Sequence, residues 1–351
     1  MSTNFDTGSN GQIPLIELDL IDEYQNPSKE EIQLLVTLLL NRPAWTLRNF
    51  LQYHKLPVSA TKQELRRRVT HELATGRIDA TDLIAALDEI EGWGNQHIYL
   101  YRSSQQQVER WVSPKEVRAI LKRNGLLHLY NRRNPIVLPA RPEISSMRHS
   151  PTRIRIQWIE THVWEERVPE EDIEDGSIIK YAYERRKARG ITTFDWDLIS
   201  GHAALMIQRL PSGSNYDLMR ERFEKELGPL VSIGLFDRLR LSRSISKIED
   251  SGEALRRQYR HEVIGGEVAS FTSRGRGKDV FENQAVKKAR EALGQGTLPL
   301  LGNLYWQPVS GKLDRVIHVK LYPKDQRVGI FGACTESEVR YLLSRIRRHS
   351  H

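Results

Sequence analysis

The segment Arg153-Ile154-Arg155-Ile156-Gln157-Trp158 marks the point at which the chain changes its hydrophobic period. Apolar and polar residues alternate strictly along it, which is typical of a β-strand. Downstream patterns predict further strands at 177–184, 203–210, 261–271, 313–321 and 327–331, and helices at 216–227, 280–293 and 336–348. Residues 152–351 are therefore expected to form a mixed, mainly antiparallel α/β domain.

Upstream of this segment the apolar residues recur at helical spacing. Ser28-x-x-Glu31 and Thr61-x-x-Glu64 are capping boxes, each followed by an apolar stripe. Helices are also expected from Thr46, over 80–91 and over 114–124, whereas residues 96–101 fit either a short strand or a continued helix. We therefore expect an α+β fold, with a disordered tail at 1–12, a helical domain at 13–130 and a basic, proline-rich linker at 131–151.

Composition limits the class of protein. The 351 residues suffice for about two domains. The single cysteine, Cys334, excludes an intramolecular disulfide framework. The longest apolar run, 32–40, is too short for a membrane span of about 20 residues, and the polar, acidic start lacks the pattern of a signal peptide. These features predict an intracellular protein of the nucleoid, cytoplasm or nucleus, with no membrane partner.

The charges are unevenly distributed. The whole chain carries a formal charge of +8 at pH 7, and residues 115–155 alone hold ten Lys or Arg against Glu116 and Glu143. Residues 160–175 hold eight acids against one arginine. The basic segment predicts a surface that follows a phosphate backbone; alternatively, it pairs with the acidic segment. Its candidate contacts are Lys115, Arg118 and Lys122 on one helix face, then Arg132 and Arg133.

Residues 47–73 read LRNFLQYHKLPVSATKQELRRRVTHEL. This segment resembles the SAP family, a helix–extended-link–helix module that binds DNA in other proteins. The resembling positions are Leu47 and Leu51, Leu56-Pro57-x-Ser59, Lys62, Leu65 and the basic stretch that follows. Lys55 and Ala60 stand where the family usually has glycine, so Lys55 is expected to take a helix-ending conformation that glycine favours.

The resemblance implies that DNA phosphates lie at the start of the second helix, where free N–H groups suit an anion. Residues 44–75 carry six basic residues against two acids. The alternative is an ordinary helical hairpin whose residues 66–68 form a solvated face. The phosphate contacts expected in this element are Lys55, Ser59, Thr61, Lys62, Arg66 and Arg67.

The order of parts along the whole chain is similar, more faintly, to the centromere-protein-N family. Its members bind nucleosomal DNA through a helical domain and linker and bind a protein partner with the C-terminal part. The resemblance carries over no individual residue. It implies that residues 152–351 bind a protein partner or a second copy of the chain.

Patterns for catalysis are sparse. Asp314 and His318-x-Lys320, with Glu282 upstream, form a loose variant of a metal-dependent nuclease pattern. A nuclease, an RNA-binding protein and a protein scaffold are thus alternatives. The sequence predicts a non-enzymatic protein that needs no cofactor and binds double-stranded DNA mainly through phosphate contacts.

Overall fold

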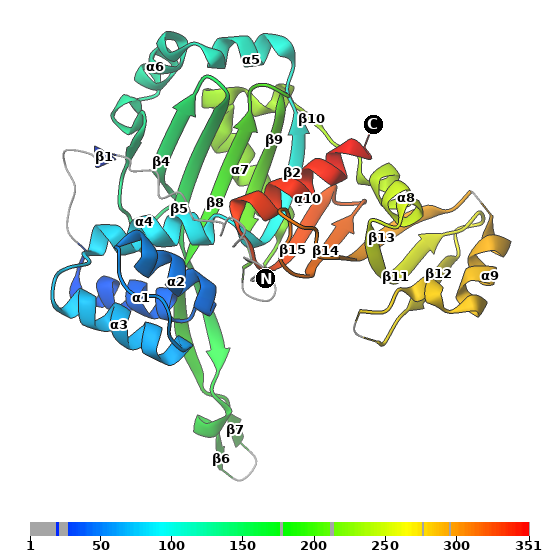
Figure 1. Ribbon diagram of the computed structural model, residues 1–351, viewed down its shortest axis with the longest axis horizontal. Helices are drawn as coiled ribbons and strands as arrows, with labels where there is room; N and C mark the ends of the chain where they lie inside the picture. Colours follow the sequence, from blue (N-terminus) through cyan, green and yellow to red (C-terminus); the bar gives the residue numbers. More distant parts are fainter. Residues whose placement is uncertain are drawn as a thin grey trace, which may run out of the picture.

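The computed structural model describes residues 19–20, 27–175, 178–210, 214–275, 277–294 and 296–350. The tail expected at 1–12 lies outside them. The described chain has the expected α+β fold, with helices concentrated in its first part and one extended sheet behind and beside them (Figure 1). None of the described helices has both the length and the apolar content to cross a membrane.

Four helices form the N-terminal part: α1 (Lys29–Leu40), α2 (Ala44–Tyr53), α3 (Lys62–Ala74) and α4 (Ala80–Glu91). Both predicted capping boxes are present, at Ser28 and Thr61, and Asp79 forms a third on α4. Each box satisfies N–H groups that a helix start leaves open. The helices pack around buried leucines that include Leu35, Leu47 and Leu65.

One sheet organises the rest of the described chain. Its strand order is β1-β3-β4-β5-β8-β9-β2-β15-β14-β13-β11-β12, with β10 paired to β2, and all pairs except β1–β3 are antiparallel. The strands are β1 (Asp19–Leu20), β2 (Gly94–Arg102), β3 (Arg132–Arg133), β4 (Glu143–Ser150), β5 (Arg153–Arg167), β8 (Tyr183–Asp197), β9 (His202–Gln208), β10 (Asp237–Arg238), β11 (Ala254–Glu262), β12 (Val268–Thr272), β13 (Leu298–Trp306), β14 (Ile317–Tyr322) and β15 (Arg327–Ala333).

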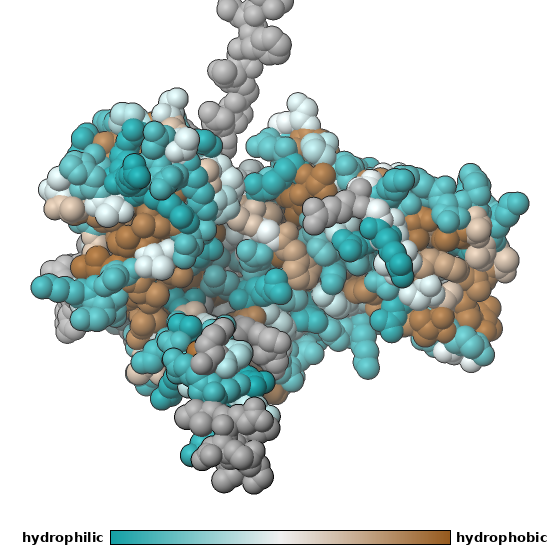
Figure 2. All heavy atoms as spheres, turned by 90° about the horizontal axis from the view of Figure 1, so that it is seen from below, coloured by the Kyte–Doolittle hydropathy of each residue, from teal (hydrophilic) through white to brown (hydrophobic). Residues whose placement is uncertain are grey.

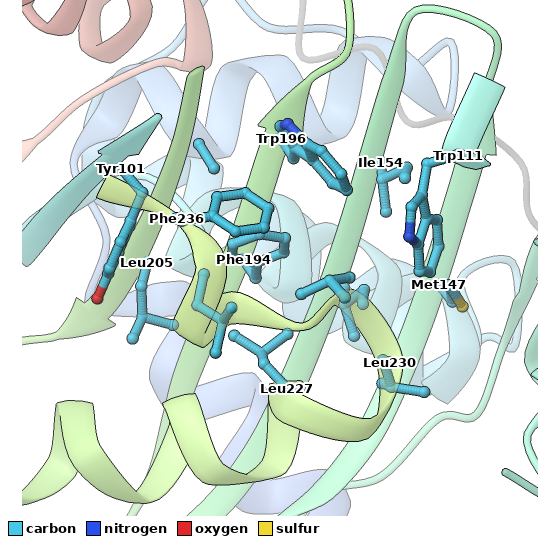
Figure 3. Packing of buried hydrophobic residues seen from close by; sticks show 14 of the residues in the cluster. Tyr101, Trp111, Met147, Ile154, Phe194, Trp196, Leu205, Leu227, Leu230 and Phe236 are labelled. Atoms are coloured by element: carbon cyan, nitrogen blue, oxygen red, sulfur yellow. The ribbon is translucent and has the colours of Figure 1, made fainter. Parts of the chain in front are cut away.

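Helices cover different halves of the two sheet faces. On one face, α5 (Gln105–Val112), α6 (Pro114–Arg123) and α7 (Tyr216–Val231) pack on the strands from β4 to β2. Figure 3 shows Phe194 and Leu205 from the strands turned toward Leu227 of α7. On the opposite face, α8 (Leu241–Ser251) and α10 (Glu336–Arg348) cover β2 and the strands beyond it, while α9 (Gln284–Leu293) lies at the far end of the sheet (Figure 1).

Strands β5 and β8 continue beyond the sheet as a long antiparallel arm, with β6 (Ile173–Asp175) and β7 (Ile178–Lys180) at its tip (Figure 1). The arm pairs acids of 160–175 with the basic start of β8, since Glu165 lies opposite Arg185 and Arg186 Nε is 3.0 Å from Glu166 Oε2. Opposite charges across an antiparallel pair stabilise the pairing. Asp172 likewise pairs with Arg167 of the arm, whereas Glu160 binds Arg222 of α7. None of these three described acids, Glu160, Glu166 and Asp172, pairs with the 115–155 segment as the alternative held.

The expected boundary at 131–151 is wrong. Strand β2, from the expected helical domain, lies between β9 and β15 in the middle of the sheet. Residues 132–133 and 143–150 are strands of the same sheet, and Val137 is buried against the N-terminal helices. Prolines alone indicated a hinge, but Pro135 and Pro139 are buried in this connection. Residues 131–151 thus join the helices to the sheet rather than separate two domains.

A buried ion-pair network fixes α4 on the sheet. The last turns of α4 carry Asp88, Glu89 and Glu91, each no more than 3% exposed. Arginines from α4's neighbours in space surround them: Arg42, Arg133, Arg148, Arg155 and Arg189. Arg189 Nη1 lies 2.7 Å from Glu91 Oε2, and its Nη2 also binds Asp88. Although burial alone lowers the pKa of Arg189, Asp88 and Glu91 outweigh it and raise that pKa, so the guanidinium is charged.

We expect Arg189→Ala to destabilise the fold by about 3–5 kcal/mol, because it leaves buried Asp88 without its closest cation and buried Glu91 without one of its two arginines. Urea unfolding followed by circular dichroism measures the change. Arg185→Ala, on the exposed part of the same strand, is the matched control and should change stability by less than about 1 kcal/mol. Equal losses in the two variants would contradict this account of the network.

Candidate nucleic-acid interface

The α2–α3 element has the helix–extended-link–helix geometry expected from the sequence. After α2 ends at Tyr53, Lys55 adopts φ +56°, and Leu56 is buried at 6% exposure between the helices. Lys55 therefore takes the left-handed conformation that glycine favours, as predicted. Thr61 then caps α3: its Oγ1 accepts a hydrogen bond from the Glu64 N–H at 3.3 Å.

The cations of this element differ in their availability. Lys55 and Arg67 are exposed and Lys62 is half-buried, and none of the three forms an ion pair with any described residue. Arg66 is engaged differently: its Nε donates to the Leu40 carbonyl at 2.7 Å, at the C-terminal end of α1. Of the expected phosphate contacts, Arg66 thus holds two helices together, while Ser59 lies exposed in the link and Thr61 serves as the cap.

A carboxylate shares the start of α3 with these cations. Glu64 Oε2 accepts hydrogen bonds from the Thr61 N–H and Oγ1, both at 2.8 Å. These two bonds hold the pKa of Glu64 below its usual range, and the bond from the backbone has the larger effect. The Glu64 side chain is therefore ionised at neutral pH. The negative charge of Glu64 opposes a phosphate at this helix start, whereas the charges of Lys55 and Lys62 attract one.

The α6 surface is the second expected contact region. Lys115, Arg118 and Lys122 are exposed, while Val117, Ile120 and Leu121 on the other side are buried, as the spacing predicts. The Arg118 guanidinium lies 4.8 Å from the centroid of the Tyr130 ring. Cations on this helix face therefore form a continuous exposed stripe.

The basic segment does not continue as a strip beyond α6. Arg132 is half-buried in β3, and Arg133 is only 3% exposed, with its Nη1 3.8 Å from Asp88 Oδ2. The prediction of Arg133 as a DNA contact is wrong, because the acids at the end of α4 draw it inward. Figure 1 places α6 and α3 toward opposite ends of strands β4 and β5, so the two exposed basic surfaces are separate.

The loose nuclease pattern is not assembled in the described chain. His318 Nε2 lies 2.8 Å from Asn303 Oδ1, and Asp314 is exposed before β14 begins. Within the described residues, no three His, Cys, Asp or Glu side chains come together as a metal site would require.

The structure instead places His318 in a cluster that the sequence did not reveal, on the sheet face opposite α8 and α10. His97 of β2 belongs to it, and its ring lies 6.0 Å from that of Phe331. Burial, and then Arg327, Arg209 and Lys320, lower the pKa of His97 to about 3. Burial, Lys320 and Arg257 lower the pKa of His318 to about 4. The only sequence signal for this cluster was the alternation of polar and apolar residues over 317–322. Such an alternation does not indicate which strands pair with this one.

No protein-family model matches the chain, and no curated protein matches its sequence. The likenesses to the SAP and centromere-protein-N families stay predictions. The case for a function therefore rests on the exposed cations and on the geometry around them.

The lowered pKa of His97 predicts a loss of stability in mild acid. Below the usual value of 6.5 the unfolded chain binds a proton on this histidine, whereas the folded chain does not until about pH 3. The contribution of neutral His97 to the free energy of unfolding is thus fully present above pH 6.5, and it is lost as the pH decreases toward 3. We expect the free energy of unfolding to fall more steeply between pH 7 and pH 5 in the native chain than in His97→Gln. Equal slopes in urea titrations would contradict the assignment.

Proposed function

We propose that the protein binds double-stranded DNA through the phosphate backbone, with the start of α3 as the main contact. The observation that supports this most is the combination of the Lys55 turn, the buried Leu56 and the capped helix start, beside which Lys62 and Arg67 make no ion pair with the described residues. The N–H groups that the capping box leaves open, together with unpaired cations, suit a phosphate. The likeness of residues 47–73 to SAP modules also supports the proposal.

The exposed stripe Lys115, Arg118 and Lys122 is proposed as a second, separate phosphate-binding surface. A duplex that contacts both surfaces would have to follow the side of the molecule from one end of β4 and β5 to the other. Such contacts position a duplex without reading its bases, so binding would be weakly sequence-specific and sensitive to salt.

The far end of the sheet is proposed as the protein-interaction surface. Strand β12 is the last strand in the sheet order, and Val268 on it is 50% exposed. Ile264 and Leu298, which flank the same corner, are 84% and 61% exposed. Figure 2 shows hydrophobic surface at this end of the molecule. An open edge strand beside exposed apolar side chains favours pairing with another chain, and we propose a second copy of this protein.

Reversing the two unpaired charges on α3 should weaken duplex binding. We expect Lys62→Glu combined with Arg67→Glu to lower the affinity for a labelled duplex about tenfold or more at low salt. The slope of log affinity against log salt should fall by about two, because two phosphate contacts are lost. Fluorescence anisotropy at several salt concentrations measures both quantities.

Two further variants control for charge and for folding. Lys225→Glu with Arg243→Glu makes the same change in net charge at exposed positions of α7 and α8, and should reduce affinity far less. Lys55→Gly removes a cation and supplies the residue that φ +56° favours, so a weaker complex would come from the lost charge rather than from unfolding. If both double reversals weakened binding equally, only net charge would matter and α3 would not be the contact.

Self-association should depend on the edge of β12. We expect light scattering to show a mass that rises from one chain toward two as the concentration increases. Val268→Lys should keep the chain monomeric, because a lysine on an edge strand opposes pairing with another strand. A native chain that stays monomeric at all concentrations would rule out the second copy as the partner at this edge.

A further inference from the structure

Aromatic rings form a row across the sheet face that α8 and α10 leave open. Tyr305 of β13 lies directly opposite His318 of β14, which in turn lies opposite Phe331 of β15. The ring centroids are 4.8 Å apart between Tyr305 and His318, and 5.0 Å between His318 and Phe331. The His97 ring continues the row into β2 at 6.0 Å. The Tyr216 ring of α7 lies 3.9 Å from that of His97, which is only 6% exposed, so the accessible part of the row belongs to β13, β14 and β15.

Cations are interleaved with these rings. Lys320 Nζ lies 5.4 Å and the Arg209 guanidinium 5.9 Å from the centroid of Phe331. The Arg257 guanidinium lies 5.8 Å from the Tyr305 centroid and donates a hydrogen bond to the Tyr305 hydroxyl. At the margin of the face, Arg327 stacks 4.4 Å over Tyr322 and binds Asp325. The cations lower the pKa values of both histidines, in addition to burial, as expected for an electropositive surface.

The burial of β14 shows that this face is open. Ile317, Val319 and Leu321 point toward α8 and α10 and are buried, whereas the alternate residues on the strand are half-buried. Helix α7 packs on the neighbouring half of the sheet, through the core cluster that contains Trp158 and Phe194. The rings over β13, β14 and β15 are therefore accessible on a rigid support.

A hollow of about 320 Å³ adjoins the row at Phe331, between the ends of β14 and β15 and the start of α2. Trp45 lines it, and the Arg315 guanidinium lies 5.5 Å from the Trp45 ring centroid. The buried indole N–H of Trp45 has no hydrogen-bond partner among the described residues. The hollow thus offers an aromatic wall and a cation next to the row.

We propose that this aromatic–cationic face binds single-stranded nucleic acid. Arg257, Lys320 and Arg209 would contact phosphates, while unpaired bases would pack on the half-buried rings and in the hollow at Trp45. Aromatic rings reach bases only where these are unpaired, because a duplex keeps its bases stacked inside. This site goes beyond the duplex contact proposed for α3 and uses none of its residues.

The full chain is titrated against two fluorescein-labelled strands of 20 nucleotides, oligo(dT) and oligo(U), by fluorescence anisotropy. We expect both to bind, and stronger binding of oligo(U) would indicate a contact to the 2′-hydroxyl. Phe331→Leu and Tyr305→Leu keep apolar bulk but remove the ring, and each should weaken binding about tenfold. Phe331→Trp should retain binding because it keeps a ring, and Lys320→Gln should reduce the salt dependence.

Tyr183→Leu removes an exposed ring from the β5–β8 arm and is the matched control, with binding expected to equal that of the native chain. Circular dichroism confirms that each variant is folded. The proposal is overturned if neither strand binds at about 100 μM protein, or if both leucine variants bind as the native chain does. Duplex binding measured in parallel separates the two sites, because Lys62→Glu with Arg67→Glu should affect the duplex and leave the single strands bound.

Discussion

The fold depends on three carboxylates, Asp88, Glu89 and Glu91, that α4 carries into the interior at its C-terminal end. Negative charge is doubly unfavourable there, because the site is dry and because a helix C-terminus is itself the negative end of the dipole. Arginines from four strands and from the turn after α1 offset both effects. Since helices α1 to α3 share one buried cluster with α4, this contact also determines where the cations of α3 stand relative to the sheet.

Two capping boxes and one alternating run correctly predicted local structure. The boxes at Ser28 and Thr61 depend on residues three positions apart, and both helices begin where predicted. The alternation of 153–158 correctly predicted a strand, and its isoleucines, Ile154 and Ile156, are buried in the core. The polar side of this strand is also buried: Arg155 meets Glu89, and Gln157 donates to the Asp88 carbonyl at 3.2 Å. Nothing in the alternation distinguishes a polar face in water from one covered by an acidic helix end.

The same distinction between local and distant causes applies to the residues of the candidate interface. The conformation of Lys55 and the burial of Leu56 follow from a pattern of a few residues. Arg66, by contrast, binds the carbonyl of Leu40, 26 positions earlier, and Arg133 is paired with Asp88, 45 positions earlier. A charge count along the chain treats every arginine of 115–155 as surface. Several of these arginines are instead buried in ion pairs with acids that are distant in the sequence. The positive surface that remains is smaller and is divided into separate parts.

The residue types on a strand depend on whether helices cover one or both of its faces. Strand β2 is buried on both faces, with Tyr99 and Tyr101 in one core cluster and Ile98 and Leu100 in the other. On β14 only the face toward α8 and α10 is aliphatic, and the other carries His318, Lys320 and Tyr322. Surface that merely faces water needs no rings, because exposed aromatic area is unfavourable without a partner. Rings aligned across strands and spaced by cations therefore have the composition of a binding surface rather than of a solvated one.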